Sequence, residues 1–351
     1  MKSYDVCQSG APLVAQDRPA PVPAGSEVLL RVLAAGVCHS DIHFWEGVYD
    51  LGGGRQMRLV DRGMRLPLTM GHENVGEVVA IGPEARGVAV GDRCLVYPWI
   101  GCGTCGVCRR GDEHLCLKPG FLGAFRPGGY AEQLLVPHPR YLLDIGTLPP
   151  EQAAPLACAG VTGYSAVLKL GDLLTREPVV IIGLGGVGSM ALACVTALGG
   201  RAIVCDIDPR KRARALDAGA IAAIDNHAEG ALQQVTEAAG GAVWAVVDFV
   251  GAGDTVRFAT DALTKGGTLV VVGLFGGEIT MSTPYFPMRA MTVRGSYVGS
   301  LAELSDLLAL VKQRGPLNVP IETRPLPRAY DALLDLKAGR VLGRVVLTPG
   351  A

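Results

Sequence analysis

Residues 178–198 read PVVIIGLGGVGSMALACVTAL, and this stretch decides the fold class of the second half of the chain. Five apolar residues come first, a G-x-G-x-x-G run follows, and a helix-like stretch begins at Ser189. In such a unit the first glycine makes a tight turn, the second lets a pyrophosphate approach the backbone, and the third lets helix and strand pack together. The N–H groups at the start of the helix favour phosphate. We therefore expect a dinucleotide-binding turn formed by Gly183, Gly185, Gly186, Val187 and Gly188.

Strand-like and helix-like segments alternate on both sides of this turn. Runs rich in Val, Ile and Leu occupy 178–182, 202–205, 243–249, 268–272 and 292–297. Helix-like stretches lie between them, at 189–198, 209–218, 230–239 and 255–262. Strands that are apolar along their whole length are typical of a parallel sheet with helices on both faces. The pattern therefore predicts a doubly wound α/β unit.

An acidic residue follows the second of these strands. Asp206 stands where a carboxylate receives the hydroxyls of an adenosine ribose, and it would repel a 2′-phosphate. Lys211 lies one helical turn further on and can also reach the ribose. The two residues predict NAD(H) in preference to NADP(H). The alternative is a glycine turn in a doubly wound fold that has lost its nucleotide, and the acidic residue argues against it.

The composition of the whole chain excludes several classes of protein. Of 351 residues, 49% are hydrophobic and 19% are charged, which suits a chain with sizeable cores and not a disordered one. A net charge of -1 offers no basic face to nucleic acid or to an anionic membrane. The uncharged stretch 178–200 has the length of a membrane span, but the glycines in its first half favour a strand and a turn. No signal peptide is recognised, so we expect a cytoplasmic protein.

The first 150 residues have a different character, with short strands and many turns. Strand-like runs lie at 27–35, 74–81 and 93–97. Near the C-terminus we expect a helix at 300–312 and a strand at 343–347. The glycine-rich segment 47–66 is expected to be a surface loop or a short helix, and it carries Arg55, Arg58, Arg62 and Arg65.

Four of the ten cysteines are clustered in the spacing C-x2-C-x2-C-x7-C, with glycines between them. Four thiolates this close in sequence can surround one tetrahedral zinc ion. No coordination position is left open, so the pattern predicts a structural zinc site. An iron–sulfur cluster and a pair of local disulfides are the alternatives, and a chain without an export signal favours a metal over disulfides. The four residues are Cys102, Cys105, Cys108 and Cys116.

A second group of metal-ligating side chains is spread over three motifs. The run C-H-S-D-I-H occupies 38–43, G-H-E occupies 71–73, and Cys158 comes just before the nucleotide unit. Taken one at a time, these residues have ordinary explanations. His72 would be a satisfied core histidine, Cys158 a small buried residue, and Ser40 with Asp41 a helix cap. Together, and beside a dinucleotide-binding unit, they indicate a catalytic metal site.

The motifs C-H-S-D-x-H, G-H-E, the four-cysteine group, C-A-G-x-T-x-Y and G-L-G-G-V-G, in this order, resemble the zinc-dependent alcohol dehydrogenases of the medium-chain dehydrogenase/reductase superfamily. The resemblance covers essentially the whole chain. It implies an α/β protein with a β-rich GroES-like catalytic domain and a doubly wound Rossmann NAD-binding domain. The implied boundaries are 1–158 and 299–351 for the catalytic domain and 159–298 for the Rossmann domain.

The resemblance also implies a role for each residue of the second metal group. Cys38, His72 and Cys158 would ligate a catalytic zinc and leave the fourth position to water or substrate, which is what zinc catalysis requires. Glu73 would lie behind the metal or serve as a transient fourth ligand. Asp41 would bond the far nitrogen of His72 and fix the orientation of the ring.

Further roles follow from the same resemblance. Ser40 and His43 match a relay that carries a proton from the substrate oxygen to the surface. Trp45 and Trp99 match aromatic walls of the substrate pocket, with core packing as the alternative. Besides the glycine run, Asp206 and Lys211, the residues expected to contact the coenzyme are His39 and Arg344 at the pyrophosphate, Thr162 at the nicotinamide, and Val272.

The function implied is reversible, NAD-linked oxidation of primary or secondary alcohols to aldehydes or ketones, by hydride transfer from a zinc-bound alkoxide. Polyol, threonine or hydroxyacyl dehydrogenases with the same machinery are alternatives, and a non-catalytic NAD-binding redox sensor is another. We expect two zinc ions per chain, NAD(H), a small alcohol or carbonyl substrate, no nucleic acid or membrane partner, and a homo-oligomer, as a tetramer rather than a dimer. The segment between His43 and Gly71 is longer than in the shorter family members. Its arginines could face an anionic substrate group, solvent or another subunit.

Overall fold

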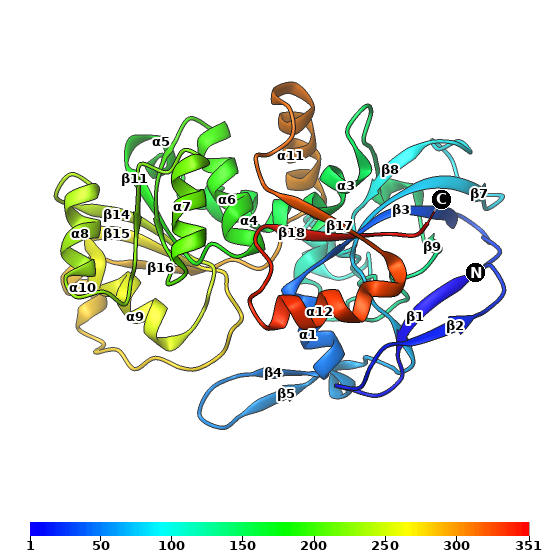
Figure 1. Cartoon of the computed structure of the whole chain (residues 1–351), viewed down its shortest axis with the longest axis horizontal. Helices are drawn as coiled ribbons and strands as arrows, with labels where there is room; N and C mark the ends of the chain where they lie inside the picture. The colour runs from blue at the N-terminus through cyan, green and yellow to red at the C-terminus, as the bar shows by residue number, and fades with distance from the viewer. Residues whose placement is uncertain (351) are drawn as a thin grey trace.

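The computed structural model describes residues 1–350 and contains two units built on separate sheets (Figure 1). The middle of the chain forms one unit, drawn in green and yellow, and the two ends of the chain share the other. The last strand, β18 (Arg344–Thr348), pairs with β3 (Val28–Val37), so residues more than three hundred positions apart become neighbours. No helix among residues 1–350 has the length and apolar character needed to cross a membrane.

Six parallel strands form the sheet of the green and yellow unit, in the order β13-β12-β11-β14-β15-β16. This is the order of the doubly wound nucleotide-binding fold. The central strand β11 is buried at every position, as expected for a strand covered on both faces. The strands are β11 (Pro178–Ile182), β12 (Arg201–Cys205), β13 (Ala222–Ile224), β14 (Val243–Asp248), β15 (Leu263–Val271) and β16 (Thr292–Gly295).

Helices connect and flank these strands. Helix α4 packs closely on α6. A Cβ atom at Gly163 would lie only 2.9 Å from the backbone of Ala191, so the two helices can approach this closely only with glycine there. The helices are α4 (Ala159–Leu168), α5 (Leu173–Arg176), α6 (Gly186–Ala197), α7 (Pro209–Asp217), α8 (Ala231–Ala238), α9 (Gly253–Ala262) and α10 (Tyr285–Arg289). Helix α11 (Leu301–Arg314) follows the last strand of this sheet and packs on α4.

The other unit contains a mixed sheet in the order β10-β8-β7-β3-β18-β17, with β9 also paired to β3. A small sheet, β2-β1-β6, lies beside it. The core beside the mixed sheet includes Leu30, Leu95 and Tyr97, which are fully buried. The remaining strands are β1 (Lys2–Val6), β2 (Val14–Asp17), β6 (Leu68–Thr69), β7 (Glu73–Ile81), β8 (Arg93–Val96), β9 (Gln133–Val136), β10 (Leu142–Asp144) and β17 (Ile321–Pro325).

Short helices complete this unit. They are α1 (His39–Glu46), α2 (Gly106–Arg109), α3 (Pro150–Ala153) and α12 (Ala329–Lys337), with the 3-10 helices η1 (Leu59–Arg62), η2 (Glu113–Leu115), η3 (Pro139–Tyr141), η4 (Ala154–Ala157) and η5 (Leu326–Arg328). Helix α1 ends at Gly47, which has the left-handed conformation that terminates many helices.

The segment 47–66 corrects one expectation. It forms an antiparallel hairpin of β4 (Val48–Asp50) and β5 (Gln56–Arg58), followed by the short helix η1, and not simply a loop or a helix. Each strand has only three residues, which is too short for an alternating pattern to be recognised in the sequence.

The other predicted elements are present with small shifts at their ends. Helix α6 begins at Gly186, inside the glycine run and before Ser189, and β15 begins at Leu263, five positions earlier than expected. The strand β13 was not predicted, because three small or apolar residues give no periodic signal.

Candidate active site

Three elements bring Cys38, His72 and Cys158 together. Cys38 follows β3 at the start of α1, and His72 immediately precedes β7, the antiparallel neighbour of β3. Cys158 lies between η4 and α4, where the chain passes from one unit to the other. One ligand atom from each of these residues and from Glu73 lies within 4.8 Å of the others, and all four residues are buried.

The donor atoms of this cluster fit a zinc ion. The Nδ1 atom of His72 lies 2.9 Å from Asp41 Oδ1, and Nε2 is buried without a hydrogen-bond partner in residues 1–350. The sulfur atoms of Cys38 and Cys158 are 3.8 Å apart. An unpartnered imidazole nitrogen facing two sulfur atoms is an arrangement that a soft, tetrahedral cation satisfies.

Hydrogen bonds fix the ligands from behind. The second oxygen of Asp41 accepts a bond of 2.9 Å from the backbone N–H of Cys38 and one of 3.0 Å from the hydroxyl of Tyr130. Asp41 therefore holds His72 and the backbone of Cys38 at the same time. The neighbouring thiol of Cys158 lowers the pKa of Cys38 well below its usual range, whereas the pKa of Cys158 is raised.

Glu73 and Arg344 form a buried ion pair beside the cluster. Glu73 also accepts a bond of 3.0 Å from the backbone N–H of Ala159. Burial raises the pKa of Glu73 to about 7, although the charge of Arg344 acts in the opposite direction. The guanidinium of Arg344 also borders the glycine turn, because a side chain at Gly186 would lie 2.3 Å from its Nη1. One side chain thus links the metal cluster to the dinucleotide turn.

The four clustered cysteines also converge. One sulfur atom from each of Cys102, Cys105, Cys108 and Cys116 lies within 4.8 Å of the other three. The shortest separation, 3.4 Å between Cys105 and Cys108, is far from the length of a disulfide bond, and all ten cysteines are free. Backbone N–H groups of Cys102 and Lys118 each point at the sulfur of Cys116 at 3.3 Å. Such N–H groups stabilise thiolates, as a structural metal site needs.

The glycine turn has the geometry that a dinucleotide requires. Gly183 has a φ of 86°, and a side chain at Gly188 would lie 1.9 Å from the carbonyl oxygen of Gly183, so neither position accepts a larger residue. Asp206 lies beside the turn and accepts bonds from the backbone N–H groups of Leu184 at 2.7 Å and Asp208 at 2.8 Å. The Nζ atom of Lys211 is 3.9 Å from the same carboxylate.

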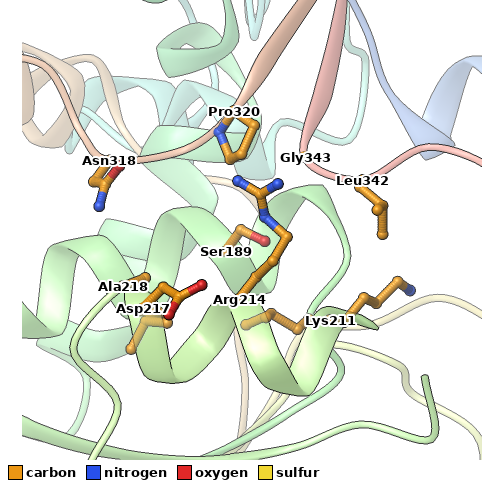
Figure 2. A pocket seen from close by; sticks show the side chains of 11 residues that line it. Ser189, Lys211, Arg214, Asp217, Ala218, Asn318, Pro320, Leu342 and Gly343 are labelled. Atoms are coloured by element: carbon orange, nitrogen blue, oxygen red, sulfur yellow. The ribbon is translucent and has the colours of Figure 1, made fainter. Parts of the chain in front are cut away.

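A cavity of about 110 Å³ adjoins this end of the turn and is bounded by both units. Figure 2 shows Lys211 and Arg214 on α7, with Pro320 and Gly343 on the opposite wall. Leu184 and Ser189 line it from the turn and α6. Lys211 lines this cavity and lies 3.9 Å from Asp206, a position that suits the ribose end of a dinucleotide.

Two histidines of α1 lie between the metal cluster and the surface. His39 is exposed, and its ring centroid lies 5.5 Å from that of His43. His43 is half-buried and stacks on Tyr49 of β4 at 4.3 Å. Burial lowers the pKa of His43, and the nearby charge of His39 lowers it further. His43 is therefore a neutral imidazole near pH 7 that can take up a proton.

Two family models match the chain: the alcohol dehydrogenase GroES-like domain over residues 24–147 and the zinc-binding dehydrogenase domain over residues 186–313. An NAD-dependent alcohol dehydrogenase of Sulfurisphaera tokodaii is 36% identical over 354 residues, which is 99% of this chain and 100% of that protein. This chain belongs to the zinc-dependent alcohol dehydrogenases. They form part of the medium-chain dehydrogenase/reductase superfamily.

Other members of the alcohol dehydrogenase family support the same placement. The crystal structure of an alcohol dehydrogenase from Aeropyrum pernix is 32% identical, with a TM-score of 0.88, and the match covers 99% of this chain and 100% of that chain. A D-arabinose 1-dehydrogenase (NADP(+)) of Saccharolobus solfataricus is 33% identical over 344 residues, or 96% of this chain and 95% of that protein. Relatives of this alcohol dehydrogenase chain thus carry the names of different substrates.

The predicted pocket residues of this alcohol dehydrogenase lie in different places. The ring of Trp99 is 5.3 Å from that of His72, and its Nε1 donates to the carbonyl of Ala157 at 3.1 Å. Trp45 instead donates to the carbonyl of Ala11 at 2.6 Å and packs against Tyr330 at 5.8 Å. These contacts place Trp99 beside the metal cluster and Trp45 against α12.

Two of the residues expected to contact the coenzyme are Thr162, expected at the nicotinamide, and Val272. Thr162 is buried in α4, and its hydroxyl has no hydrogen-bond partner within the described part of the chain. Val272 directly follows β15, at the edge where the strands of the parallel sheet end. Ser40 is half-buried in the first turn of α1.

Sequence reasoning missed three aromatic residues around the cluster. Phe44 lies 5.8 Å from His72, ring to ring, and Tyr297 lies 6.2 Å from Trp99. Tyr49 stacks on His43. Phe44 gave no separate signal because it stands among the other residues of helix α1. Tyr49 belongs to the hairpin that we expected to be a loop or a helix.

Proposed function

We propose that this chain is an NAD-linked, zinc-dependent alcohol dehydrogenase that interconverts primary or secondary alcohols with aldehydes or ketones. One observation carries the proposal: the buried cluster of Cys38, His72 and Cys158 has an unpartnered imidazole nitrogen and is linked by Arg344 to a dinucleotide turn. A metal site and a coenzyme site in contact are what hydride transfer from an alcohol requires. The names of relatives such as the NAD-dependent alcohol dehydrogenase of Sulfurisphaera tokodaii support this reading.

In this proposal Cys38, His72 and Cys158 hold the catalytic zinc. When bound, zinc supplies a Lewis acid for the substrate oxygen, and NAD supplies the hydride acceptor. Asp41 fixes the ring of His72 so that Nε2 faces the cluster. Glu73 stays behind the ligands because Arg344 and the backbone of Ala159 hold its carboxylate. Cys102, Cys105, Cys108 and Cys116 hold the structural zinc.

The proton leaves in the direction of the surface. Ser40 lies in the first turn of α1, and His43 lies one turn further along the same helix. We propose that the Ser40 hydroxyl passes the proton and that the imidazole of His43 takes it up, which general base catalysis allows when the base is neutral. Trp99 and the aromatic residues near it exclude water from the reacting end of the substrate.

Replacing His43 by alanine should slow alcohol oxidation by about tenfold to a hundredfold, since a positioned base contributes at least that much. The neutral form of His43 is the active one, so the wild-type relay is lost only as the pH falls through a pKa that burial has lowered. In the variant, the loss of activity relative to the wild type should be greatest just above that pKa, where the wild-type relay still works and hydroxide is scarce, and it should become smaller at alkaline pH. An equal loss at every pH would contradict the relay. The exposed His227, changed to alanine, is the control.

The coenzyme would lie along the glycine turn, with its adenosine ribose at Asp206 and Lys211. His39 and Arg344 would face the pyrophosphate, and Thr162 and Val272 the nicotinamide. Arg344 is suited to this role because its guanidinium borders Gly186.

Changing Asp206 to alanine should raise the KM for NAD and reduce the preference for NAD over NADP by about tenfold or more, or ~1.4 kcal/mol. The carboxylate that would receive the ribose hydroxyls and repel a 2′-phosphate is then gone. Steady-state kinetics with both coenzymes measure the ratio. Asp208→Ala is the matched control, because Asp208 caps α7 and pairs with Arg210 instead. An unchanged preference in Asp206→Ala would remove this residue from the coenzyme site.

The experiment that tests the whole proposal combines a metal count with a substrate screen. Elemental analysis of the purified chain should find two zinc ions per chain, and NAD should be reduced in the presence of aliphatic or aromatic alcohols. Preference for polyols, threonine or hydroxyacyl compounds in the same screen would assign the chain to one of those classes. Binding of NADH without oxidation of any alcohol would favour a redox sensor and overturn the proposal.

We propose in addition that residues 1–158 and 299–351 form the catalytic domain, that 159–298 form the coenzyme domain, and that the protein is a cytoplasmic homo-oligomer, most simply a tetramer. Strand β16 supports the oligomer, since it is exposed at all four positions at the edge of the parallel sheet. Exposed apolar side chains surround it, and sheet edges of this kind pair readily. They are Tyr285, Phe286 and Met288, together with Val293 on the strand itself. Light scattering gives the number of subunits.

A further inference from the structure

The β4–β5 hairpin extends from the metal-binding unit to the nucleotide unit. In Figure 1 it leaves the end of α1 and projects toward the loop that follows β15. Its tip is the sequence Gly52-Gly53-Gly54, and all three glycines have positive φ. The hairpin thus adds a further contact between the units, apart from Arg344 and the points where the chain itself passes from one unit to the other.

The tip of the hairpin contacts the nucleotide unit through backbone atoms. A Cβ atom at Gly52 would lie 2.6 Å from the carbonyl carbon of Gly277, and a Cβ atom at Gly276 would lie 2.9 Å from the Cβ atom of Asp50 and 3.1 Å from its carbonyl oxygen. Real Cβ atoms do not approach other atoms so closely, so the contact exists only because both segments carry glycine at these positions. Glycine pairs of this kind indicate two backbones that must meet.

A charged pair lies beside this contact but does not account for it. The guanidinium of Arg55 is 3.9 Å from the carboxylate of Glu278, and the two side chains are 71% and 63% exposed. Pairs this exposed contribute little, so the packing of the glycines determines the position of the tip.

The loop that receives the hairpin lies at the coenzyme edge of the sheet. Strand β15 runs parallel to β14, which runs parallel to β11, so the loop after β15 and the glycine turn after β11 emerge at the same edge. In doubly wound folds the dinucleotide binds at this edge. Val272, proposed to contact the nicotinamide, begins the loop that continues to Gly276 and Gly277.

The other end of the hairpin is anchored at the proton relay. Tyr49 of β4 stacks on His43, three residues before the Gly52 contact. A movement of the tip away from Gly277 would therefore carry Tyr49 with it. The same hairpin faces the relay at its base and the coenzyme loop at its tip.

We infer that the hairpin is an interdomain strap, and that Gly52 and Gly276 are positioning residues whose packing must be released before the coenzyme leaves the cleft. The inference rests on the proposed function, because it requires NAD(H) to bind at the glycine turn. A strap of this kind retains the reduced coenzyme while the contact holds and sets the rate at which the cleft opens.

The test measures NADH dissociation by stopped-flow fluorescence, with displacement by excess NAD. In Gly52→Ala and Gly276→Ala the new methyl group pushes the two segments apart, and NADH should dissociate about tenfold faster than from the wild type. Gly54→Ala is the matched control: Gly54 belongs to the same tip and has a φ of 73°, close to the 77° of Gly52, but nothing lies within 4 Å of its Cβ position. Both hairpin variants carry similar backbone strain, so a difference in NADH release between them comes from the contact with Gly277.

The outcomes separate the strap from the proposed function. Faster release in Gly52→Ala and Gly276→Ala, with wild-type release in Gly54→Ala, supports the strap. Equal rates in Gly52→Ala and Gly54→Ala, with NADH still bound, overturn it and leave the dehydrogenase assignment in place. A wild-type chain that binds no NADH overturns the proposed function itself.

Discussion

A Cys38→Ser variant should lose alcohol oxidation almost completely, by about a thousandfold or more in kcat/KM, and should still bind NADH. Cys38 is one of three buried donors proposed for the catalytic zinc, and a Lewis acid at the substrate oxygen is worth several kcal/mol, where ~1.4 kcal/mol is a factor of ten. The glycine turn and Asp206 lie outside the cluster, so coenzyme binding has no reason to fail. Elemental analysis should find one zinc ion per chain in place of two.

The control is Cys94→Ser. Cys94 is also buried, in β8, and belongs to neither of the two metal-binding groups found in the described residues. Burial raises the pKa of Cys94 to about 11, so its thiol stays neutral. The Cys94→Ser variant should keep both zinc ions and its rate of alcohol oxidation. Near-normal activity in Cys38→Ser would show that this cluster is not the catalytic metal site.

An Arg344→Met variant should be strongly destabilised, by about 3–5 kcal/mol, because it leaves the carboxylate of Glu73 buried without its partner. Both side chains of this pair are nearly inaccessible, with 3% and 0% exposure. The double variant Arg344→Met/Glu73→Gln removes both charges and should recover much of the loss. The free energy of unfolding in urea measures each value.

A pair of the same chemical type provides the comparison. Arg31 and Glu77 join adjacent strands of the mixed sheet with a separation of 3.1 Å, but their side chains are 51% and 23% exposed. Arg31→Met should therefore change the free energy of unfolding by less than about 1 kcal/mol. Equal losses in Arg344→Met and Arg31→Met would mean that burial of the Glu73 pair adds nothing.

Much of this architecture could be predicted because its signals are local. The glycine run, the strand before it and the helix after it are contiguous, and that strand, β11, is apolar and buried at every position. The four clustered cysteines occupy fifteen successive positions, so their convergence needs only one folded loop. The family matches confirm the fold class and the two kinds of domain.

The meeting of Cys38, His72 and Cys158 could not be obtained from spacing alone. It depends on the pairing of β3 with β7 and on the path of the chain between η4 and α4, which the resemblance to a family supplied. The link from Arg344 to Glu73 spans 271 positions and has no sequence pattern. A buried glutamate beside metal ligands needs a positively charged partner, but no sequence pattern identifies which of the many basic residues is that partner.

The hairpin was missed for a different physical reason. Its strands are too short for periodicity, and its position is determined by glycines that leave no side-chain signature. For Trp45 the sequence left two roles open, a wall of the substrate pocket or core packing. Its indole packs against Tyr330 of α12 and donates to the carbonyl of Ala11, contacts that fit core packing, and the pocket role stays a prediction.

The pairing of β3 with β18 has a consequence for the order of events during synthesis. The six-stranded sheet is complete once Gly295 has left the ribosome, because all its strands lie between residues 178 and 295. The sheet begun earlier must wait for residues 344–348, the neighbours of β3, before its edge is filled. The later-made unit can therefore close first, and the N-terminal strands spend most of translation as an open template exposed to other chains.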